Sequence, residues 1–266
     1  MDIEKKKFEC YRGVLKIKGT VFLPKKEGKF PVAVICHEFM ANQKLSFDYA
    51  EVLANQGMAA FCFDFCGGGV VCSSDGKRRE MSVLTEVEDL RQVIRFAMEQ
   101  PYSEPDHLIL MGCSQGGLVA ALMAAEIHNQ VDALILLYPA LSIPDDARNG
   151  SMLALKFDPA NIPEKMMCGP MPLGRRYVED VLDMDPFAIL PQYTGNILLV
   201  HGDQDNVVSL DYSRTAEEAY RNAGARVKLV VIEGGKHVFQ NKEHKELAIA
   251  EIKALTASVL KDQSAE

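Results

Sequence analysis

Short apolar runs rich in β-branched residues alternate along this chain with longer segments of helical periodicity. The runs occupy residues 31–36, 58–63, 107–111, 132–137, 196–200 and 227–232. Runs without a polar alternation are typical of strands buried on both faces, as in a parallel sheet covered by helices. Residues 8–23, punctuated by Gly13 and Gly19, predict an antiparallel hairpin in front of them. The pattern therefore predicts an α/β fold with a mostly parallel, eight-stranded sheet.

The segments between the runs predict helices on both faces of that sheet. Apolar residues recur at helical spacing at positions 83, 87, 90, 94 and 97, and again at 248, 252, 255 and 259. This spacing gives a helix one apolar stripe, which suits packing against a sheet. Residues 118–125 are apolar all round and predict a helix buried behind the strand that precedes it.

Residues 139–193 interrupt the alternation and are called the insertion below. They hold eight of the twelve prolines, and Tyr177–Leu190 is their only long periodic segment. A long irregular insertion in a compact domain is usually functional. A disordered linker is disfavoured because the segment is too apolar for a solvated chain. We expect one α/β domain over residues 1–266, with the insertion as a cap or lid subdomain between the sixth and seventh strands.

Charge and composition exclude several classes of partner. Proteins that bind nucleic acid or an anionic membrane usually carry an excess of basic residues, whereas the formal net charge here is −8. A small neutral or hydrophobic substrate is therefore expected. Seven cysteines without a C-x-x-C pair suggest neither a disulfide framework nor a metal site. The charged N-terminus lacks the apolar core of a signal peptide, which predicts a cytoplasmic protein. A homodimer is compatible with the chain, and the sequence leaves the oligomeric state open.

The stretch GCSQGG at residues 112–117 places two nucleophilic side chains next to each other. G-x-S-x-G between a strand and a helix is the nucleophile elbow, a sharp turn that exposes one side chain. Gly112 and Gly116 frame Ser114, whereas a frame centred on Cys113 would have bulky residues at both glycine positions. Cys113 should point to the opposite face and pack in the core. Ser114 is therefore the predicted nucleophile.

A serine nucleophile needs a histidine base and a carboxylate that orients it, in the chain order Ser, acid, His. His237 follows the last strand and precedes the last helix, which makes it the best base. Asp205 and Asp203 both follow the strand at 196–200, and we prefer Asp205 because Asp203 lies in a tight turn where aspartate commonly caps its own backbone. His201 precedes the acid and should brace its loop. Surface or structural roles suit His107, His128 and His244.

An acyl-transfer site also needs backbone donors for the oxyanion of the tetrahedral intermediate. One should come from the residue after the nucleophile, Gln115, and the other from the loop after an earlier strand. The N–H of Phe39, in the loop after residues 31–36, is the predicted second donor. No cofactor is required. Since the base must be neutral and free histidine titrates near ~6.5, activity should rise through roughly neutral pH.

The motifs resemble those of the α/β-hydrolase family, and within it the small bacterial cinnamoyl (feruloyl) esterases. The resemblance covers nearly the whole chain and includes the elbow, His37-Glu-Phe39, the stretch from Phe63 to Gly76, the loop after residue 200 and Gly235-Lys-His237. It implies hydrolysis of small carboxylic esters, with an aromatic acyl group lodged under the insertion. Glu38 stands where that group has glycine, and Gly67-Gly-Gly69 lacks the histidine often found there.

Other activities fit the same residues. A dienelactone-hydrolase-like or thioesterase activity would use the same triad. A peptidase of the prolyl-oligopeptidase type is disfavoured because no propeller or other gating domain precedes residue 30. A non-catalytic binding protein on a hydrolase fold is a further alternative, favoured only by Glu38. Arg175 and Arg176 could meet a substrate carboxylate, but a solvated pair is the simpler interpretation.

Overall fold

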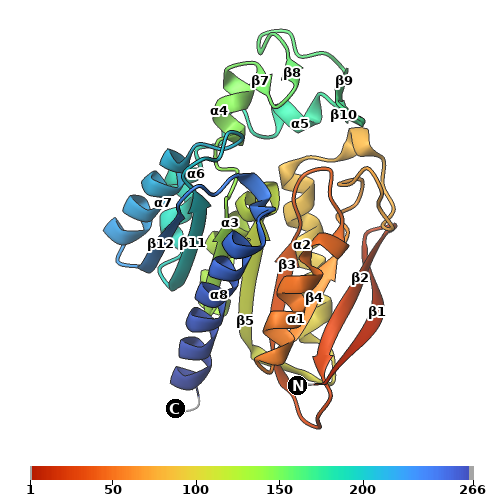
Figure 1. Cartoon of the computed structure of the whole chain (residues 1–266). Helices are drawn as coiled ribbons and strands as arrows, with labels where there is room; N and C mark the ends of the chain where they lie inside the picture. Colours follow the sequence, from red (N-terminus) through yellow and green to blue (C-terminus); the bar gives the residue numbers. More distant parts are fainter. Residues whose placement is uncertain (1, 264–266) are drawn as a thin grey trace.

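The structure, a computed structural model, describes residues 2–263 and is centred on an eight-stranded sheet (Figure 1). Strand β2 runs antiparallel to both of its neighbours, and the pairs from β4 to β12 are parallel. This confirms the predicted mostly parallel α/β sheet. In spatial order the strands are β1 (Ile3–Arg12), β2 (Leu15–Pro24), β4 (Ala59–Phe63), β3 (Phe30–Cys36), β5 (Ser103–Cys113), β6 (Ala133–Leu137), β11 (Asn196–Gly202) and β12 (Arg226–Ile232).

The predicted hairpin at the front is formed by β1 and β2. Gly13 lies in its turn with φ 58°, as expected for a residue that punctuates two strands. Gly19 does not mark a turn, because it lies inside β2. A Cβ atom there would lie 2.3 Å from the Phe8 ring, so glycine makes room for a core aromatic on the paired strand.

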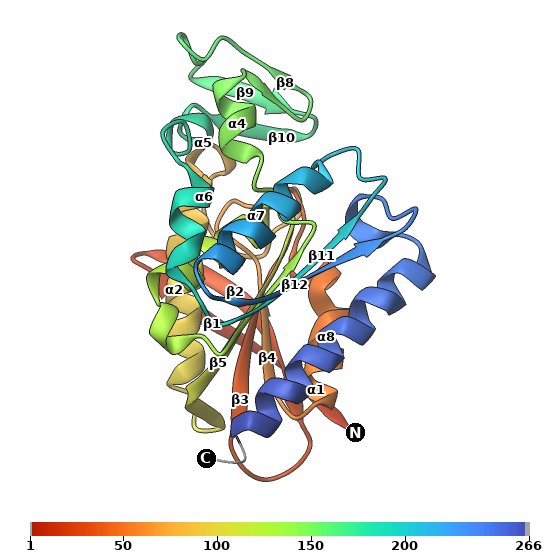
Figure 2. The ribbon, with the colours of Figure 1, turned by 90° about the vertical axis from the view of Figure 1, so that its left-hand side faces the viewer.

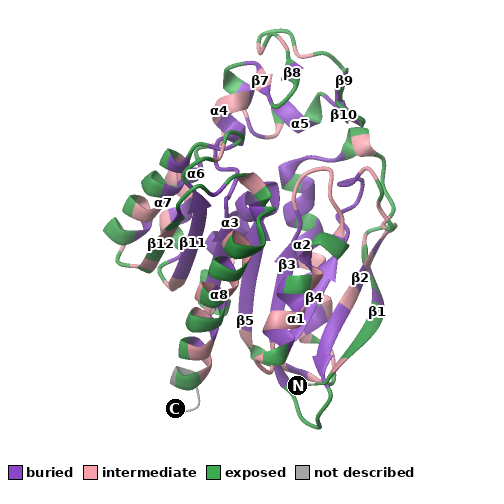
Figure 3. Ribbon diagram, in the orientation of Figure 1, coloured by how far each residue is buried: buried purple, intermediate pink, exposed green. Residues whose placement is uncertain are grey.

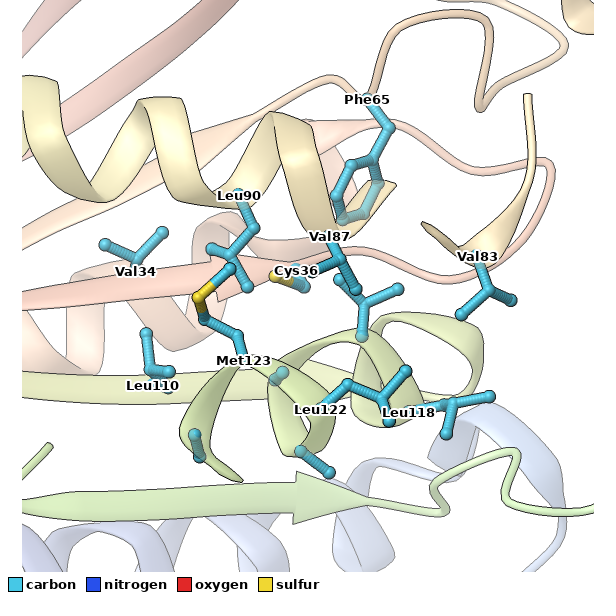
Figure 4. Packing of buried hydrophobic residues seen from close by; sticks show 14 of the residues in the cluster. Val34, Cys36, Phe65, Val83, Val87, Leu90, Leu110, Leu118, Leu122 and Met123 are labelled. Atoms are coloured by element: carbon cyan, nitrogen blue, oxygen red, sulfur yellow. The ribbon is translucent and has the colours of Figure 1, made fainter. Parts of the chain in front are cut away.

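Helices cover both faces of the sheet, as Figure 2 shows from the side. One face carries α2 (Val83–Met98), α3 (Gln115–Glu126) and α7 (Leu210–Asn222), whereas α1 (Phe47–Asn55) and α8 (Lys242–Gln263) cover the other. Along β3 and β5 successive residues contribute to the two cores in turn. Figure 4 shows the first core, where side chains of α2 and α3 pack against β3 and β5. Figure 3 shows the central strands as buried.

The insertion joins β6 to β11, and its residues 143–179 lie at the top of the view in Figure 1. Tyr177–Leu190 does not form one helix, because Asp185 caps a new helix that starts at Pro186. The two small hairpins β7–β8 and β9–β10 were too short to be predicted from periodicity. The elements are α4 (Ile143–Arg148), β7 (Ser151–Met152), β8 (Leu155–Lys156), β9 (Lys165–Cys168), β10 (Met171–Gly174), α5 (Arg176–Glu179), α6 (Pro186–Ile189) and η4 (Leu190–Gln192).

The carboxyl ends of the parallel strands meet at one edge of the sheet, which is where open α/β sheets bind ligands. Strand β3 leads there into residues 37–42, and β5 leads into Ser114. Strands β11 and β12 lead into the loops that carry Asp205 and His237. The topology therefore brings the predicted site residues to a common edge. The remaining short helices are η1 (Gln43–Ser46), η2 (Arg78–Glu80), η3 (His128–Gln130) and η5 (His237–Phe239).

Candidate active site

Ser114 forms the turn between β5 and α3, with φ 50° and ψ −120°. Backbone strain of this kind costs on the order of 1–3 kcal/mol and persists only where the surroundings enforce it. The surroundings here leave no space beside the turn. A Cβ on Gly112 would lie 2.1 Å from the Gly116 carbonyl oxygen, and a Cβ on Gly116 would lie 2.4 Å from that of His37. Both glycines are therefore required for the turn.

Cys113 points away from the turn, into the core under α1 and α8. It is 1% exposed, and burial raises the pKa of its thiol well above the ordinary value. A thiol is nucleophilic as the thiolate, so a buried neutral thiol is inert. The structure thus supports a packing role for Cys113.

Ser114, His237 and Asp205 form a continuous line of hydrogen bonds. The Ser114 hydroxyl lies 2.9 Å from His237 Nε2, and His237 Nδ1 lies 2.7 Å from Asp205 Oδ2. Since the carboxylate accepts from Nδ1–H, Nε2 is left to accept the serine proton. The histidine side chain is 12% exposed and that of Asp205 is fully buried. This arrangement has the geometry of a nucleophile, a base and an orienting acid.

Asp205 is held as a carboxylate by several donors. Its Oδ1 accepts the N–H groups of Val207 and Val208, and its Oδ2 lies 3.1 Å from His201 Nε2 as well as next to His237. Burial raises the pKa of Asp205, but the hydrogen bonds from His201, His237 and Val208 outweigh that effect and hold it below the ordinary value. His201 is itself fixed by Ser213, so it braces this loop as predicted.

Asp203, the alternative acid, has a different partner. Its Oδ1 accepts the N–H of Gly234 at 2.7 Å, and the residue is exposed. The expected cap on its own backbone is therefore wrong, because Asp203 joins its loop to the loop that leads to His237. Only Asp205 of the two carboxylates contacts the imidazole in the described part of the chain.

The two residues predicted to supply the oxyanion donors, Phe39 and Gln115, both line the pocket that contains Ser114. Gln115 is the first residue of α3, so its N–H has no acceptor within the helix. Phe39 lies in the loop after β3, which the neutral imidazole of His37 braces: Nε2 accepts the Phe65 N–H at 3.2 Å, and Nδ1–H donates to the Glu38 carbonyl at 2.7 Å. Burial lowers the pKa of His37 and favours this neutral form. Sequence reasoning missed this bracing role.

Glu38 does not obstruct the loop. Its Oε1 accepts a hydrogen bond from the Tyr138 hydroxyl at 3.0 Å, and Glu38 is not among the residues that line the pocket at Ser114. Tyr138 directly follows β6 with φ 37°, and its ring meets the His237 ring at 4.8 Å in an edge-on arrangement. Glu38 therefore fixes a tyrosine that supports the imidazole, a contact that sequence reasoning did not identify.

A second buried network connects the elbow to the insertion. The Gln115 side chain donates to Glu86 Oε2 at 2.8 Å and accepts from the Tyr177 hydroxyl at 2.6 Å. The Tyr177 ring in turn stacks on Phe39 at 5.3 Å. Burial raises the pKa of Glu86 well above its ordinary value, and the hydrogen bond from Gln115 offsets this effect only in part, so the buried site favours the neutral form of Glu86. An acid on the apolar stripe of α2 was the sequence signal for this network.

We expect Glu86→Gln to remove a pH-dependent loss of stability. The folded chain keeps the Glu86 proton above the ordinary pKa of 4.5, where the unfolded chain releases it, so stability falls as pH rises through that window. The slope approaches about 1.4 kcal/mol per pH unit. In thermal unfolding experiments, the Tm of Glu86→Gln minus the Tm of wild type should therefore increase from pH 5 to pH 8. Exposed Glu88→Gln on the same helix is the control, and parallel curves for Glu86→Gln would contradict the assignment.

The pocket at Ser114 is small. It has a volume of about 40 Å³ and lies between the elbow, the oxyanion loop and the insertion. This space is enough for water but far below the roughly 300–1,000 Å³ of small-molecule sites. The lining is mainly apolar and consists of Phe39, Ser114, Gln115, Ala140, Ser142, Ile143, Asp146, Met152, Leu153, Tyr177, Val207 and Val208.

The described part of the chain, residues 2–263, shows neither a metal site nor a membrane-spanning helix. Over that range no group of three or more histidine, cysteine, aspartate or glutamate residues is arranged to hold a metal ion. Over the same range no helix combines the length and apolar character needed to cross a membrane.

Comparisons with known proteins place this geometry in context. A family model described as serine aminopeptidase, S33, matches residues 30–167, which is more than half of the chain. Among solved structures, Est1E from Butyrivibrio proteoclasticus with ferulic acid bound is 29% identical. That match covers 96% of this chain and 99% of Est1E with a TM-score of 0.87.

Curated relatives are more distant or match over a shorter range. The thiohydrolase aneE of Aspergillus aculeatus is 29% identical over 129 residues, which cover 48% of this chain and 39% of the thiohydrolase. The match thus spans less than half of that protein. An uncharacterized peptidase, YtmA of Bacillus subtilis, is 23% identical over 203 residues, covering 73% of this chain and 70% of the peptidase.

Proposed function

The chain belongs to the α/β-hydrolase family described as serine aminopeptidase, S33, and on that premise we propose that this hydrolase is a serine carboxylic-ester hydrolase. The observation that carries the proposal is the hydrogen-bonded line from Ser114 through His237 to Asp205. Its substrates are small esters with an apolar or aromatic acyl group, and the insertion acts as the cap over that group.

The first half of the reaction transfers the acyl group to the enzyme. Ser114 Oγ attacks the ester carbonyl carbon while His237 Nε2 takes the hydroxyl proton, and the Asp205 carboxylate stabilises the resulting imidazolium. The N–H groups of Phe39 and Gln115 bind the oxyanion of the tetrahedral intermediate, where one such donor contributes roughly 10²–10³ in kcat. The intermediate then collapses, and the imidazolium returns the proton to the departing alcohol.

The second half releases the acid. A water molecule gives a proton to His237 Nε2 and attacks the acyl carbon of the Ser114 ester, through a second oxyanion at the same two N–H groups. Collapse restores the serine hydroxyl and frees the carboxylic acid. Both halves of the reaction balance with protons that move only among Ser114, His237, water and the departing alcohol, so no step calls for a metal or redox cofactor.

Two observations support an apolar or aromatic acyl group. Aliphatic and aromatic side chains of the insertion and of the acid loop line the pocket, including Ile143, Met152 and Tyr177. Est1E, which is similar over nearly the whole chain, has ferulic acid bound, an aromatic carboxylic acid. Binding of an acyl group there would bury its apolar surface, and such burial stabilises a complex by about 25 cal/mol per Å² of apolar surface.

A fluorophosphonate probe and a panel of esters test the proposal. We expect the probe to label Ser114, identified by peptide mass spectrometry, and to abolish hydrolysis of p-nitrophenyl esters. Within the panel, kcat/KM should be higher for a cinnamoyl ester than for an acetyl ester of the same alcohol. Absence of both labelling and ester turnover would sink the proposal, whereas turnover restricted to acetyl esters would overturn the acyl preference alone.

Thioester hydrolysis is the second candidate, favoured by the similarity to a thiohydrolase over about half of this chain. The same nucleophile, base and oxyanion donors serve an ester and a thioester, because both react through a tetrahedral oxyanion. Matched substrates with one acyl group and either an oxygen or a sulfur leaving atom separate the two activities. A kcat/KM for the thioester that greatly exceeds that of the ester would replace the first proposal with the second.

A further inference from the structure

A second, larger cavity lies beside the pocket at Ser114. This groove has a volume of about 730 Å³ and runs between the loop of residues 67–80 and the β9–β10 and α5 part of the insertion. Gly69 lines it and pairs with Met40, the neighbour of the pocket residue Phe39. Arg176 also lines it and directly precedes the pocket residue Tyr177. The groove is therefore a neighbour of the proposed ester site, but none of its residues has a role there.

The charge of this groove is opposite to that of the whole chain. The protein has 29 basic and 37 acidic residues and a net charge of −8. Of the groove's lining residues, only Glu80 and Glu164 are acidic. A concave surface lined by one sign of charge concentrates counter-ions of the other sign. Six of the lining residues are basic: Lys77, Arg78, Arg79, Lys165, Arg175 and Arg176.

Three of these cations are available to a ligand. Among residues 2–263, the side chains of Lys77, Arg79 and Lys165 make no ion pair and no hydrogen bond. Arg176 does have a partner, Asp180, at 3.0 Å. Arg78 is used within the protein, since its guanidinium donates to two backbone carbonyls of the same loop. The unpaired cations come from both walls, so a ligand in the groove would meet charge on either side.

Hydrogen bonds and close packing within the protein hold both walls of the groove in place. On the loop side, Asp64 Oδ2 accepts the Ser73 N–H at 2.7 Å, and the Ser74 hydroxyl donates to the Asp64 carbonyl. On the other side, the insertion rests directly on η2, where a Cβ on Gly174 would lie 2.2 Å from the Arg79 carbonyl oxygen. A preformed site does not lose binding free energy to the ordering of its loops.

We propose that this groove binds a small molecule, or an arm of one, that carries at least two negative charges of the phosphate or carboxylate kind. Arginine guanidinium groups match the planar edges of such anions with paired hydrogen bonds, and lysine adds a point charge. The anion is either an arm of the ester substrate or a separate molecule. The first of these two alternatives rests on the proposed function. The solvated arginine pair expected from the sequence is thereby assigned to a larger cationic surface.

Calorimetric titration with pyrophosphate at constant ionic strength tests the site directly, with no ester present. We expect the triple variant Lys77→Gln, Arg79→Gln, Lys165→Gln to bind about 10-fold more weakly than wild type, because it loses three charged contacts that together need to contribute only about 1.4 kcal/mol. The control variant Lys7→Gln, Lys29→Gln, Lys253→Gln removes the same charge from exposed positions elsewhere whose side chains form no ion pair within residues 2–263, and its affinity should stay within about 2-fold of wild type. The charge-keeping variant Lys77→Arg, Lys165→Arg should retain binding.

No pyrophosphate binding by wild type, or equal weakening in the two triple variants, would overturn the proposal. Because this titration needs no hydrolysis, its failure is separate from failure of the ester hydrolase proposal. Kinetics then identify the source of the anion. For a substrate arm, the groove variant raises KM for an ester with a phosphorylated alcohol and leaves a neutral ester unchanged. For a separate molecule, pyrophosphate changes kcat/KM for the neutral ester in wild type but not in the groove variant.

Discussion

Ser114→Ala is expected to lower kcat/KM for a p-nitrophenyl ester by roughly 10⁴–10⁶-fold. Removing the nucleophile of a Ser-His-Asp triad abolishes covalent catalysis and leaves only the contribution of the oxyanion donors and of binding. The Gly112 and Gly116 contacts that define the turn do not involve the Ser114 side chain, so the variant should fold. Steady-state kinetics and loss of fluorophosphonate labelling measure the effect.

The neighbouring cysteine supplies a matched control. Cys113→Ala should leave kcat/KM within a few-fold of wild type, because the buried thiol lies in the core and not in the pocket. It should lower stability modestly, as large-to-small core changes do. Full labelling of Ser114→Ala, or loss of turnover in Cys113→Ala alone, would reverse the choice between the two nucleophiles.

The same serine variant separates an enzyme from a non-catalytic binding protein. Binding of a carboxylic acid product does not need the hydroxyl as a nucleophile, so its affinity for Ser114→Ala should remain close to that for wild type. If wild type binds the acid and hydrolyses no ester, thioester or amide, the chain is a binding protein on a hydrolase fold.

Asp205→Asn is expected to reduce kcat/KM by about 10³–10⁴-fold, the scale seen when the orienting acid of such a triad is replaced. The amide can present its N–H₂ to His237 Nδ1 and so place the imidazole proton on Nε2, where it blocks acceptance of the serine proton. The carboxylate that wild type keeps is already ionised at neutral pH, because its donors hold the pKa below the ordinary value. The ionised Asp205 therefore contributes to the stability of the fold at every pH above the ordinary pKa of aspartate. This contribution is lost only as the pH falls into the acidic range.

Asp203→Asn is the matched control for that variant. In the described part of the chain the Asp203 side chain accepts one hydrogen bond, from the Gly234 N–H, which an asparagine oxygen can also accept. Its activity should stay within a few-fold of wild type under the same ester assay. Equal losses in the two variants would show that loop geometry, and not contact with His237, explains the effect of residue 205.

The fold and the line of site residues were predictable because they depend on local pattern and on topology. Strand runs and the elbow are read from adjacent residues, and the carboxyl ends of parallel strands must share an edge. This reasoning places both Asp203 and Asp205 at that edge, and the reason given for preferring Asp205, a backbone cap made by Asp203, was wrong. The actual partner of Asp203, Gly234, lies on another loop and is not visible in local sequence.

Features that depend on how distant segments meet were not predictable. The Glu86–Gln115–Tyr177 network joins α2, the elbow and the insertion, and its hydrogen bonds depend on how each element is rotated. The segment 177–190 has helical periodicity, yet Asp185 and Pro186 start a new helix within it. The basic groove combines residues about ninety positions apart, and its charge is hidden by an acidic average.

The pocket of about 40 Å³ at Ser114 has a consequence for substrate affinity. This volume is too small for an acyl group, so we expect a substrate to bind only those protein molecules in which the pocket has widened. The apparent dissociation constant then equals the intrinsic one divided by the fraction of open molecules. Bulkier acyl groups require wider and rarer openings, and selectivity among esters becomes a property of the closed-to-open equilibrium as well as of contacts in the pocket.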